Sequence, residues 1–188
     1  MENSELLGVI DSMVWTKKAA IFLLLLDRAL VNLESANLTH DRCEEAIDLC
    51  WQWMSDRSVD GDHLAYYLDS DEMQNGPLAE QNFESDSLQQ NSLILILLVV
   101  GFFAHRAYEF SGQQEKMSAS IAEANEGAID YIVDYVDKTD LRSVLFGFLS
   151  KSETFSGGAF MIRAPWGDEQ YWRGRETKDN KKGDRFIL

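Results

Sequence analysis

The feature that most constrains the fold is a run of twelve apolar residues near the middle of the chain, Leu93–Ala104. Its flanks are polar, and Ser85 or Ser87 is a suitable cap, so the pattern predicts a helix that ends near Phe110. A helix that is apolar on every side must be covered on most sides by the rest of the fold. Because a membrane span needs about 20 apolar residues, we interpret the run as a core helix and expect no membrane contact.

Proline is almost absent, with only Pro77 and Pro165 in 188 residues. Since proline breaks helix interiors, its absence favours long helices. The length and an apolar content of 45% predict one globular unit with a core of its own. We therefore expect an all-α fold, a single helical-bundle domain of about six helices with a C-terminal tail, where any short hairpin would lie.

Apolar residues at helical spacing place the other helices. Ser111-Gly112 ends the core helix, with the glycine as C-cap. The pattern further predicts, in chain order, one long helix or two joined near a cap at Asp11 or Ser12 between Leu6 and Leu33, a helix opened by Thr39, a short helix His63–Leu68, a helix Gln114–Val136, and a helix Asp140–Leu149 capped by Thr139.

The composition changes at Ser156. Residues 156–188 carry seven basic and five acidic side chains, net +2, so the first 155 residues carry −17 (−15 minus +2). We predict an acidic helical domain, 1–155, followed by a basic and aromatic tail, 156–188. Such a tail can bind nucleic acid by stacking, but the acidic body opposes that approach. Docking of the tail on the body or on a neighbour is the simpler interpretation.

The negative charge is concentrated in Asp41–Asp86. This segment holds thirteen acidic residues and two basic ones, Arg42 and Arg57, net −11 (2 minus 13). A surface of this density repels nucleic acid and anionic lipid and attracts basic partners. The predicted contact residues are eight carboxylates and three aromatic anchors: Asp60, Asp62, Asp69, Asp71, Glu72, Glu80, Glu84, Asp86, Trp53, Tyr66 and Tyr67.

Trp51 and Trp53 cannot point the same way on one helix. We expect one of them to pack in the core with Cys50 and Met54 and the other to be half exposed. An exposed tryptophan beside carboxylates is a good anchor for a partner. The alternative is that the loop Asp69–Gln81 covers it.

The two cysteines, Cys43 and Cys50, fall on one apolar stripe. Seven residues of helix separate them by about 10 Å, too far for a disulfide, so we expect buried, inert thiols. Reduced thiols, and an N-terminus without the basic region of a signal peptide, predict a cytoplasmic protein.

No catalytic motif is present: the chain lacks a nucleophile elbow, a phosphate-binding loop and a dinucleotide turn. His63 between nearby carboxylates is the best candidate metal ligand, but the helical ligand spacing of metal sites and the calcium-loop spacing are both missing. We predict no catalytic residue, no metal and no cofactor, and hence not an enzyme. The alternatives are a helical metal-binding protein or enzyme that uses His63, and a homodimeric helical adaptor.

The stretch Glu44–Trp53, EEAIDLCWQW, followed by a short helix with Leu64, Tyr67 and Leu68, resembles the sixth numbered family of bacterial immunity proteins from polymorphic toxin systems of the contact-dependent inhibition type. The similarity extends roughly over 14–136, and the tail departs from it.

The resemblance implies a small, acidic, helical protein that neutralises a cognate toxin domain by direct binding. Many such toxins are nucleases, whose basic active-site surfaces an acidic inhibitor can cover. It implies no binding residues, so the contact residues above rest on charge and exposure. We expect a monomer or a weak homodimer.

Overall fold

Helix α5 (Leu88–Ser111) is the central element of the structure, a computed structural model that describes residues 3–33, 38–68, 83–154, 161–162 and 186–187. The Ser87 hydroxyl accepts a hydrogen bond from the backbone N–H of Gln90 and so caps its start. Gly112 ends it with a left-handed backbone, φ 69°. The predicted core helix and both of its caps are therefore confirmed.

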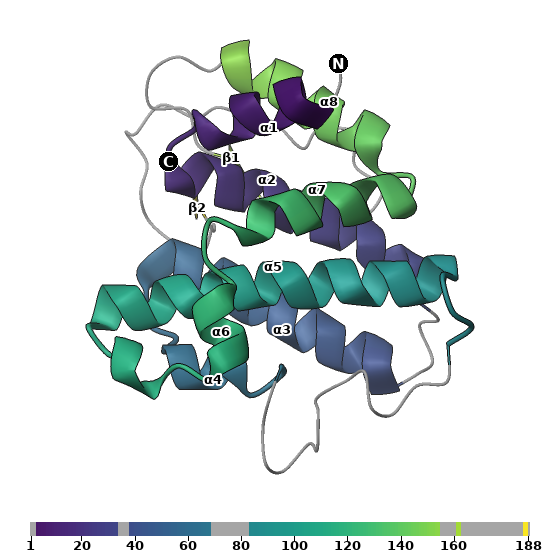
Figure 1. Cartoon of the computed structure of the whole chain (residues 1–188). Coiled ribbons are helices and arrows are strands. Elements are labelled where there is room, and N and C mark those ends of the chain that lie inside the picture. The colour runs from purple at the N-terminus through teal and green to yellow at the C-terminus, as the bar shows by residue number, and fades with distance from the viewer. Residues whose placement is uncertain (1–2, 34–37, 69–82, 155–160, 163–185, 188) are drawn as a thin grey trace.

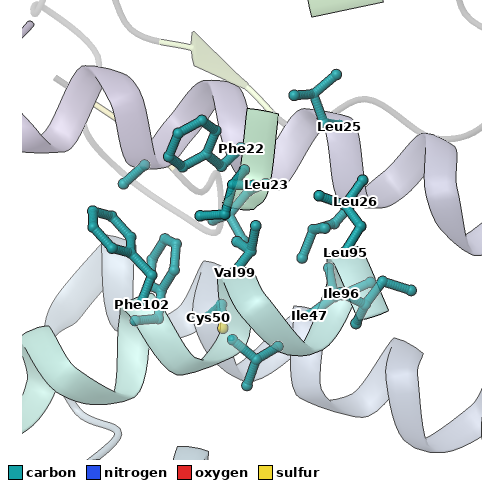
Figure 2. Packing of buried hydrophobic residues seen from close by; sticks show 14 of the residues in the cluster. Phe22, Leu23, Leu25, Leu26, Ile47, Cys50, Leu95, Ile96, Val99 and Phe102 are labelled. Carbon is teal, nitrogen blue, oxygen red and sulfur yellow. The ribbon is translucent and has the colours of Figure 1, made fainter. Parts of the chain in front are cut away.

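Two helices pack against α5 and also contact each other: α2 (Trp15–Ala29) and α3 (Leu38–Asp56). Figure 2 shows Phe22 and Leu26 of α2, Cys50 of α3 and Val99 of α5 in one packed cluster. Each such side chain contributes about 1.5–3 kcal/mol when it leaves water. Although α5 is long and apolar enough to cross a membrane by length and composition, 61% of that stretch is buried inside this fold, as a core helix requires.

The other helices pack around this centre, and the all-α prediction is confirmed (Figure 1). Helices α4, α6 and α7 contact α5. Helix α1 contacts α7, and helix α8 contacts both α2 and α7. The remaining helical elements of the described residues are α1 (Asn3–Asp11), η1 (Leu30–Asn32), α4 (Gly61–Ala65), η3 (Gln114–Lys116), α6 (Ala119–Glu123), α7 (Ala128–Lys138) and α8 (Arg142–Thr154).

The described residues contain eight α-helices instead of about six, because predicted helices are split. The helix is interrupted between α1 and α2, but neither Asp11 nor Ser12 is the N-cap of α2. Val14 is the N-cap of α2 without a side-chain bond, and the Ser12 hydroxyl instead donates to the carbonyl of Val9 at 2.7 Å. Of the two alternatives that the sequence left open, two helices are confirmed, and the proposed caps at Asp11 or Ser12 are wrong.

The predicted helix Gln114–Val136 is wrong as a continuous element. The Ser118 hydroxyl accepts from the N–H of Ile121 and starts α6 separately, and Gly127 precedes α7. The prediction for Thr139 is also wrong, since its hydroxyl donates to the carbonyls of the last turn of α7 and closes that helix. A threonine near a helix boundary suits either end, and here the preceding carbonyls are its partners.

Two short strands lie in the tail. β1 (Met161–Ile162) pairs antiparallel with β2 (Phe186–Ile187), Met161 opposite Ile187. The backbone of β2 lies beside α2 and α3. Residues 163–185 lie outside the described residues, so the division into 1–155 and 156–188 stays a prediction.

Substitution Ile96→Asp tests the central role of α5. Ile96 is fully buried between its neighbours, and an unpaired buried charge costs several kcal/mol against a total stability of about 5–15 kcal/mol. We expect loss of the cooperative thermal transition in circular dichroism at 222 nm. Ile96→Val is the control, with an expected cost of about 0.5–1.5 kcal/mol. A cooperative transition near the wild-type temperature in Ile96→Asp would contradict the assignment.

Substitution Gly61→Ala tests the contact between α4 and α5. A Cβ at Gly61 would lie 2.5 Å from Cγ of Tyr108, at the centre of a packed ring. The ring must therefore move, at a cost of about 1–3 kcal/mol. Urea unfolding measures this, with Gly8→Ala as control because a Cβ there meets nothing within 4 Å. Equal unfolding midpoints for the two variants would show that the contact is not close.

Candidate functional site

Four of the predicted contact residues lie in or beside α4: Asp60, Asp62, Tyr66 and Tyr67. Together with His63, the candidate metal ligand, they form a site that we call the α4 corner. The short helix begins at Gly61, two residues before the predicted start, because Asp60 caps it. One carboxylate oxygen of Asp60 accepts from the backbone N–H of His63 at 2.9 Å and lies 2.6 Å from its ring Nδ1. Asp60 is thus held in one position by a single neighbour.

The charge of Asp60 is stabilised by the same contacts. Partial burial alone would raise the pKa of Asp60, but the hydrogen bonds from the backbone and ring of His63, together with the positive charge of Lys116, hold the pKa below its ordinary value. The carboxylate is therefore ionised throughout the neutral range.

Asp62 is anchored to the end of α5. The Tyr108 hydroxyl donates to one of its oxygens at 2.7 Å, and Lys116 Nζ lies 3.6 Å from the other. Gly61 makes this possible, because any Cβ there would collide with the Tyr108 ring. Burial, followed by the bond to Asp62, raises the pKa of Tyr108 and keeps the donor protonated.

The two tyrosines connect the corner to α3. Tyr66 is partly exposed and packs edge-on against Tyr67, with ring centroids 5.4 Å apart. The Tyr67 hydroxyl donates to a carboxylate oxygen of Glu45 at 3.3 Å. Burial and the Glu45 charge raise the pKa of Tyr67 to about 12. Sequence reasoning missed Glu45, although it lies in the same acidic segment and two exposed carboxylates of α3 lie beside it in sequence, Asp41 and Glu44.

Two other predicted contact residues, Glu84 and Asp86, lie at the opposite end of α5. They precede its first turn, whereas Asp62 binds near its last turn (Figure 1). With a rise of about 1.5 Å per residue, Leu88 and Tyr108 are roughly 30 Å apart. The described carboxylates therefore form two separate groups and not one patch. Four further predicted residues lie outside the described residues: Asp69, Asp71, Glu72 and Glu80.

The expectation of a half-exposed tryptophan is wrong. Trp51 and Trp53 are 0% and 2% exposed. Helix α3 is covered on more than one side, so residues that point differently both reach packed surroundings. Trp53 lies against Trp15 and Phe103, with ring centroids 5.4 Å and 6.0 Å away. The Trp53 ring is therefore part of the core and not a surface anchor.

Cys43 and Cys50 lie on the predicted stripe and are both buried and free. Burial raises the pKa of Cys43 to about 12 and raises the pKa of Cys50 as well. A thiol that stays protonated is a poor nucleophile, so these side chains act as core residues.

No group of three His, Cys, Asp or Glu side chains suited to a metal ion occurs within the described part of the chain. The contact between His63 and Asp60 is explained by helix capping. Chemically, the α4 corner offers ionised carboxylates and a tyrosine surface, which suit contact with basic side chains of a protein.

Sequence reasoning also missed a cationic group at this same end of α5. Arg57 lies over the Trp53 ring at 3.7 Å, and Arg106 and Phe110 lie beside it. The available signal was that Arg57 is one of only two basic residues in the acidic segment.

The chain matches a known protein family. The family model described as immunity protein Imm6 matches residues 17–139, a span that runs from the first turn of α2 through α3, the α4 corner and α5 to the end of α7. No match is found among curated proteins or among solved structures. Because the matched span exceeds half of the chain, this protein belongs to the Imm6 family of immunity proteins.

Proposed function

We propose that this chain neutralises a cognate toxin domain by binding it through the carboxylates of the α4 corner. The observation that carries the proposal is that Asp60 and Asp62 are each fixed by hydrogen bonds while their charges face an exposed surface. Membership of an immunity protein family supplies the class of partner. We expect no catalytic step in this neutralisation.

Preorganisation is what distinguishes these carboxylates from an ordinary solvated acidic surface. A flexible side chain loses about 0.5–1.5 kcal/mol of conformational freedom when a partner fixes it. The bonds to His63 and Tyr108 have already restricted Asp60 and Asp62 in the free protein. A lysine or arginine of the toxin therefore meets acceptors whose positions are set in advance.

The overall charge of −15 supports a basic partner. Opposite charges on two proteins raise the association rate, by about 10- to 1000-fold for strongly complementary surfaces. An inhibitor must bind before its toxin turns over, so a fast association is useful. A toxin that acts on nucleic acid, with a basic surface for phosphates, fits this description.

We also propose that the encounter takes place in the cytoplasm and that the protein acts as a monomer. Two free thiols in the core are compatible with a reducing compartment. Tyr66, which is partly exposed beside the carboxylates, would supply the aromatic contact at this interface.

Two charge-neutralising variants test the location of the surface. In Asp60→Asn/Asp62→Asn, the asparagine at position 60 can still cap α4, and the asparagine at position 62 still offers an acceptor to the Tyr108 hydroxyl. In Glu84→Gln/Asp86→Asn, asparagine tolerates the φ of 58° at position 86. Both change the net charge by +2, at opposite ends of α5. We expect the first to slow association with the toxin domain by about 3- to 10-fold at low ionic strength and to flatten its salt dependence, and the second to have a clearly smaller effect.

Stopped-flow association rates across a salt series measure this. Asp69→Asn/Asp71→Asn/Glu72→Gln extends the test to residues outside the described part of the chain. Equal rates and equal salt slopes for wild type and Asp60→Asn/Asp62→Asn would refute the assignment of toxin contact to the α4 corner.

Substitution His63→Ala separates binding from chemistry. The backbone N–H of residue 63 still caps α4 through Asp60, so the fold should remain intact. Loss of the ring bond should let the pKa of Asp60 rise toward its ordinary value, as measured by NMR titration. Since that group stays ionised at pH 7, protection of cells against the toxin should remain near normal. Abolished protection by a folded His63→Ala protein would favour a metal or catalytic role.

A further inference from the structure

A cationic and aromatic group lies beside the α4 corner, and we call it the Arg57 patch: Trp15, Trp53, Arg57, Arg106 and Phe110. The guanidinium of Arg57 stacks on the Trp53 ring at 3.7 Å and lies 5.8 Å from the Phe110 centroid. Arg106 lies 5.6 Å from the Trp15 ring. Side chains of α2, α3 and α5 therefore meet around two guanidinium groups, of which that of Arg106 is paired with Glu109.

This surface is open to a partner. The Phe110 side chain is 66% exposed although it packs edge-on against Trp53 at 6.1 Å. Arg106 is 46% exposed, and Arg57 is partly exposed. The buried ring of Trp53 packs under the guanidinium of Arg57. Trp53, predicted as a surface anchor, thus contributes to this surface only by supporting Arg57. Arginine and aromatic side chains in well-packed surroundings are typical of an interface hot spot.

Within the described part of the chain, Arg57 has no carboxylate partner, whereas other cations there do. Arg106 pairs with Glu109 at 2.8 Å, and Lys138 pairs with Asp134 at 2.9 Å. Among the described residues Arg57 forms no ion pair; it donates to the Trp53 carbonyl at 3.2 Å and lies near the Met54 sulfur. Burial and the like charge of Arg106 lower the pKa of Arg57. The residues that the structure describes therefore give this guanidinium one carbonyl oxygen and one sulfur as acceptors, and no carboxylate.

The backbone at Arg57 adds a second observation. It has a φ of 59° immediately after the end of α3, a conformation in which glycine is the favoured residue. The helix end does not require a side chain there. The guanidinium itself is held by the Trp53 ring and by the Trp53 carbonyl in the last turn of α3.

We propose that the Arg57 patch is a second anchor for the toxin domain and receives an aspartate or glutamate side chain of that domain. This inference rests on the proposed function. The carboxylate would accept hydrogen bonds from Arg57, and the apolar surface around it would pack on Phe110. A toxin surface that is basic throughout would be repelled here, so the occupant must present a negative group.

One interface can cover both sites. The segment that follows α3 contacts Phe110 at Arg57 and Tyr108 at Gly61 and Asp62, so it crosses the C-terminal end of α5. A standard interface buries about 800 Å² on each partner, which is enough for neighbouring sites of this size. Adjacent negative and positive anchors then fix the orientation of the toxin as well as its affinity.

The decisive variant is Arg57→Gly, because glycine suits the backbone and removes only the side chain. We expect it to retain the wild-type melting temperature within a few degrees and to bind the toxin domain at least about 10-fold more weakly, mainly through faster dissociation. Arg57→Lys keeps the charge without the planar fork and should lie between the two. Phe110→Ala should weaken binding in the same direction.

The controls are Lys138→Ala, which removes a cation at the other end of α5, and Val31→Ala, which truncates an exposed apolar residue on η1. Both should bind like wild type. Surface plasmon resonance with the toxin domain encoded beside this chain measures the rates. Reversing the charge, Arg57→Glu, should be rescued by one Asp- or Glu-to-Lys change on the toxin, which identifies the carboxylate.

The outcomes separate the two proposals. If the wild-type protein does not bind the toxin domain, the proposed function fails and this inference fails with it. If wild type binds and Arg57→Gly binds equally tightly, only this inference is overturned. If light scattering shows a homodimer that Arg57→Gly or Phe110→Ala dissociates, the occupant is a second copy, and the proposal is also overturned.

Discussion

The burial of α5 is the constraint on which the rest of this structure depends. A helix that is apolar on every side is stable in water only when other elements surround it, and α2, α3, α4, α6 and α7 all contact it. The requirement sets the roles of those elements. Helix α7 presents Ile132 and Val136 inward and Asp130 and Asp134 outward. Helix α7 therefore carries negative charge on its outer face while its inner face covers α5.

The same constraint positions the candidate site. The last turns of α5 carry Tyr108 and Phe110, which project to different sides and meet the segment after α3 at Asp62 and at Arg57. That segment has little apolar surface of its own, and its geometry is fixed by these contacts and by the Asp60 cap. An acidic site and a cationic site thus owe their positions to neighbouring side chains of one core helix.

Much of this architecture follows from local patterns in the sequence. The caps Ser87 and Gly112 and the buried stripe of α3 rest on interactions within about one helical turn, and they were predicted correctly. The errors arise where distant contacts decide. Thr139 suits either helix end by its chemistry, and both tryptophans of α3 are buried because α3 is covered on more than one side. The predicted contact carboxylates that the structure describes do not lie in one group, for the same reason. Glu84 and Asp62 are close in sequence, but they lie at opposite ends of α5.

Electrostatic complementarity and specificity place different demands on this surface. A net charge of −15 attracts any basic protein, so charge alone discriminates poorly among partners. Discrimination requires a feature that penalises the wrong partner, and a cation held on a tryptophan within an acidic chain is such a feature. A basic protein without a carboxylate at the matching position would gain attraction at Asp60 and Asp62 but meet repulsion at Arg57. If both proposed sites bind the toxin, their spacing at one end of α5 selects partners by geometry as well as by sign of charge.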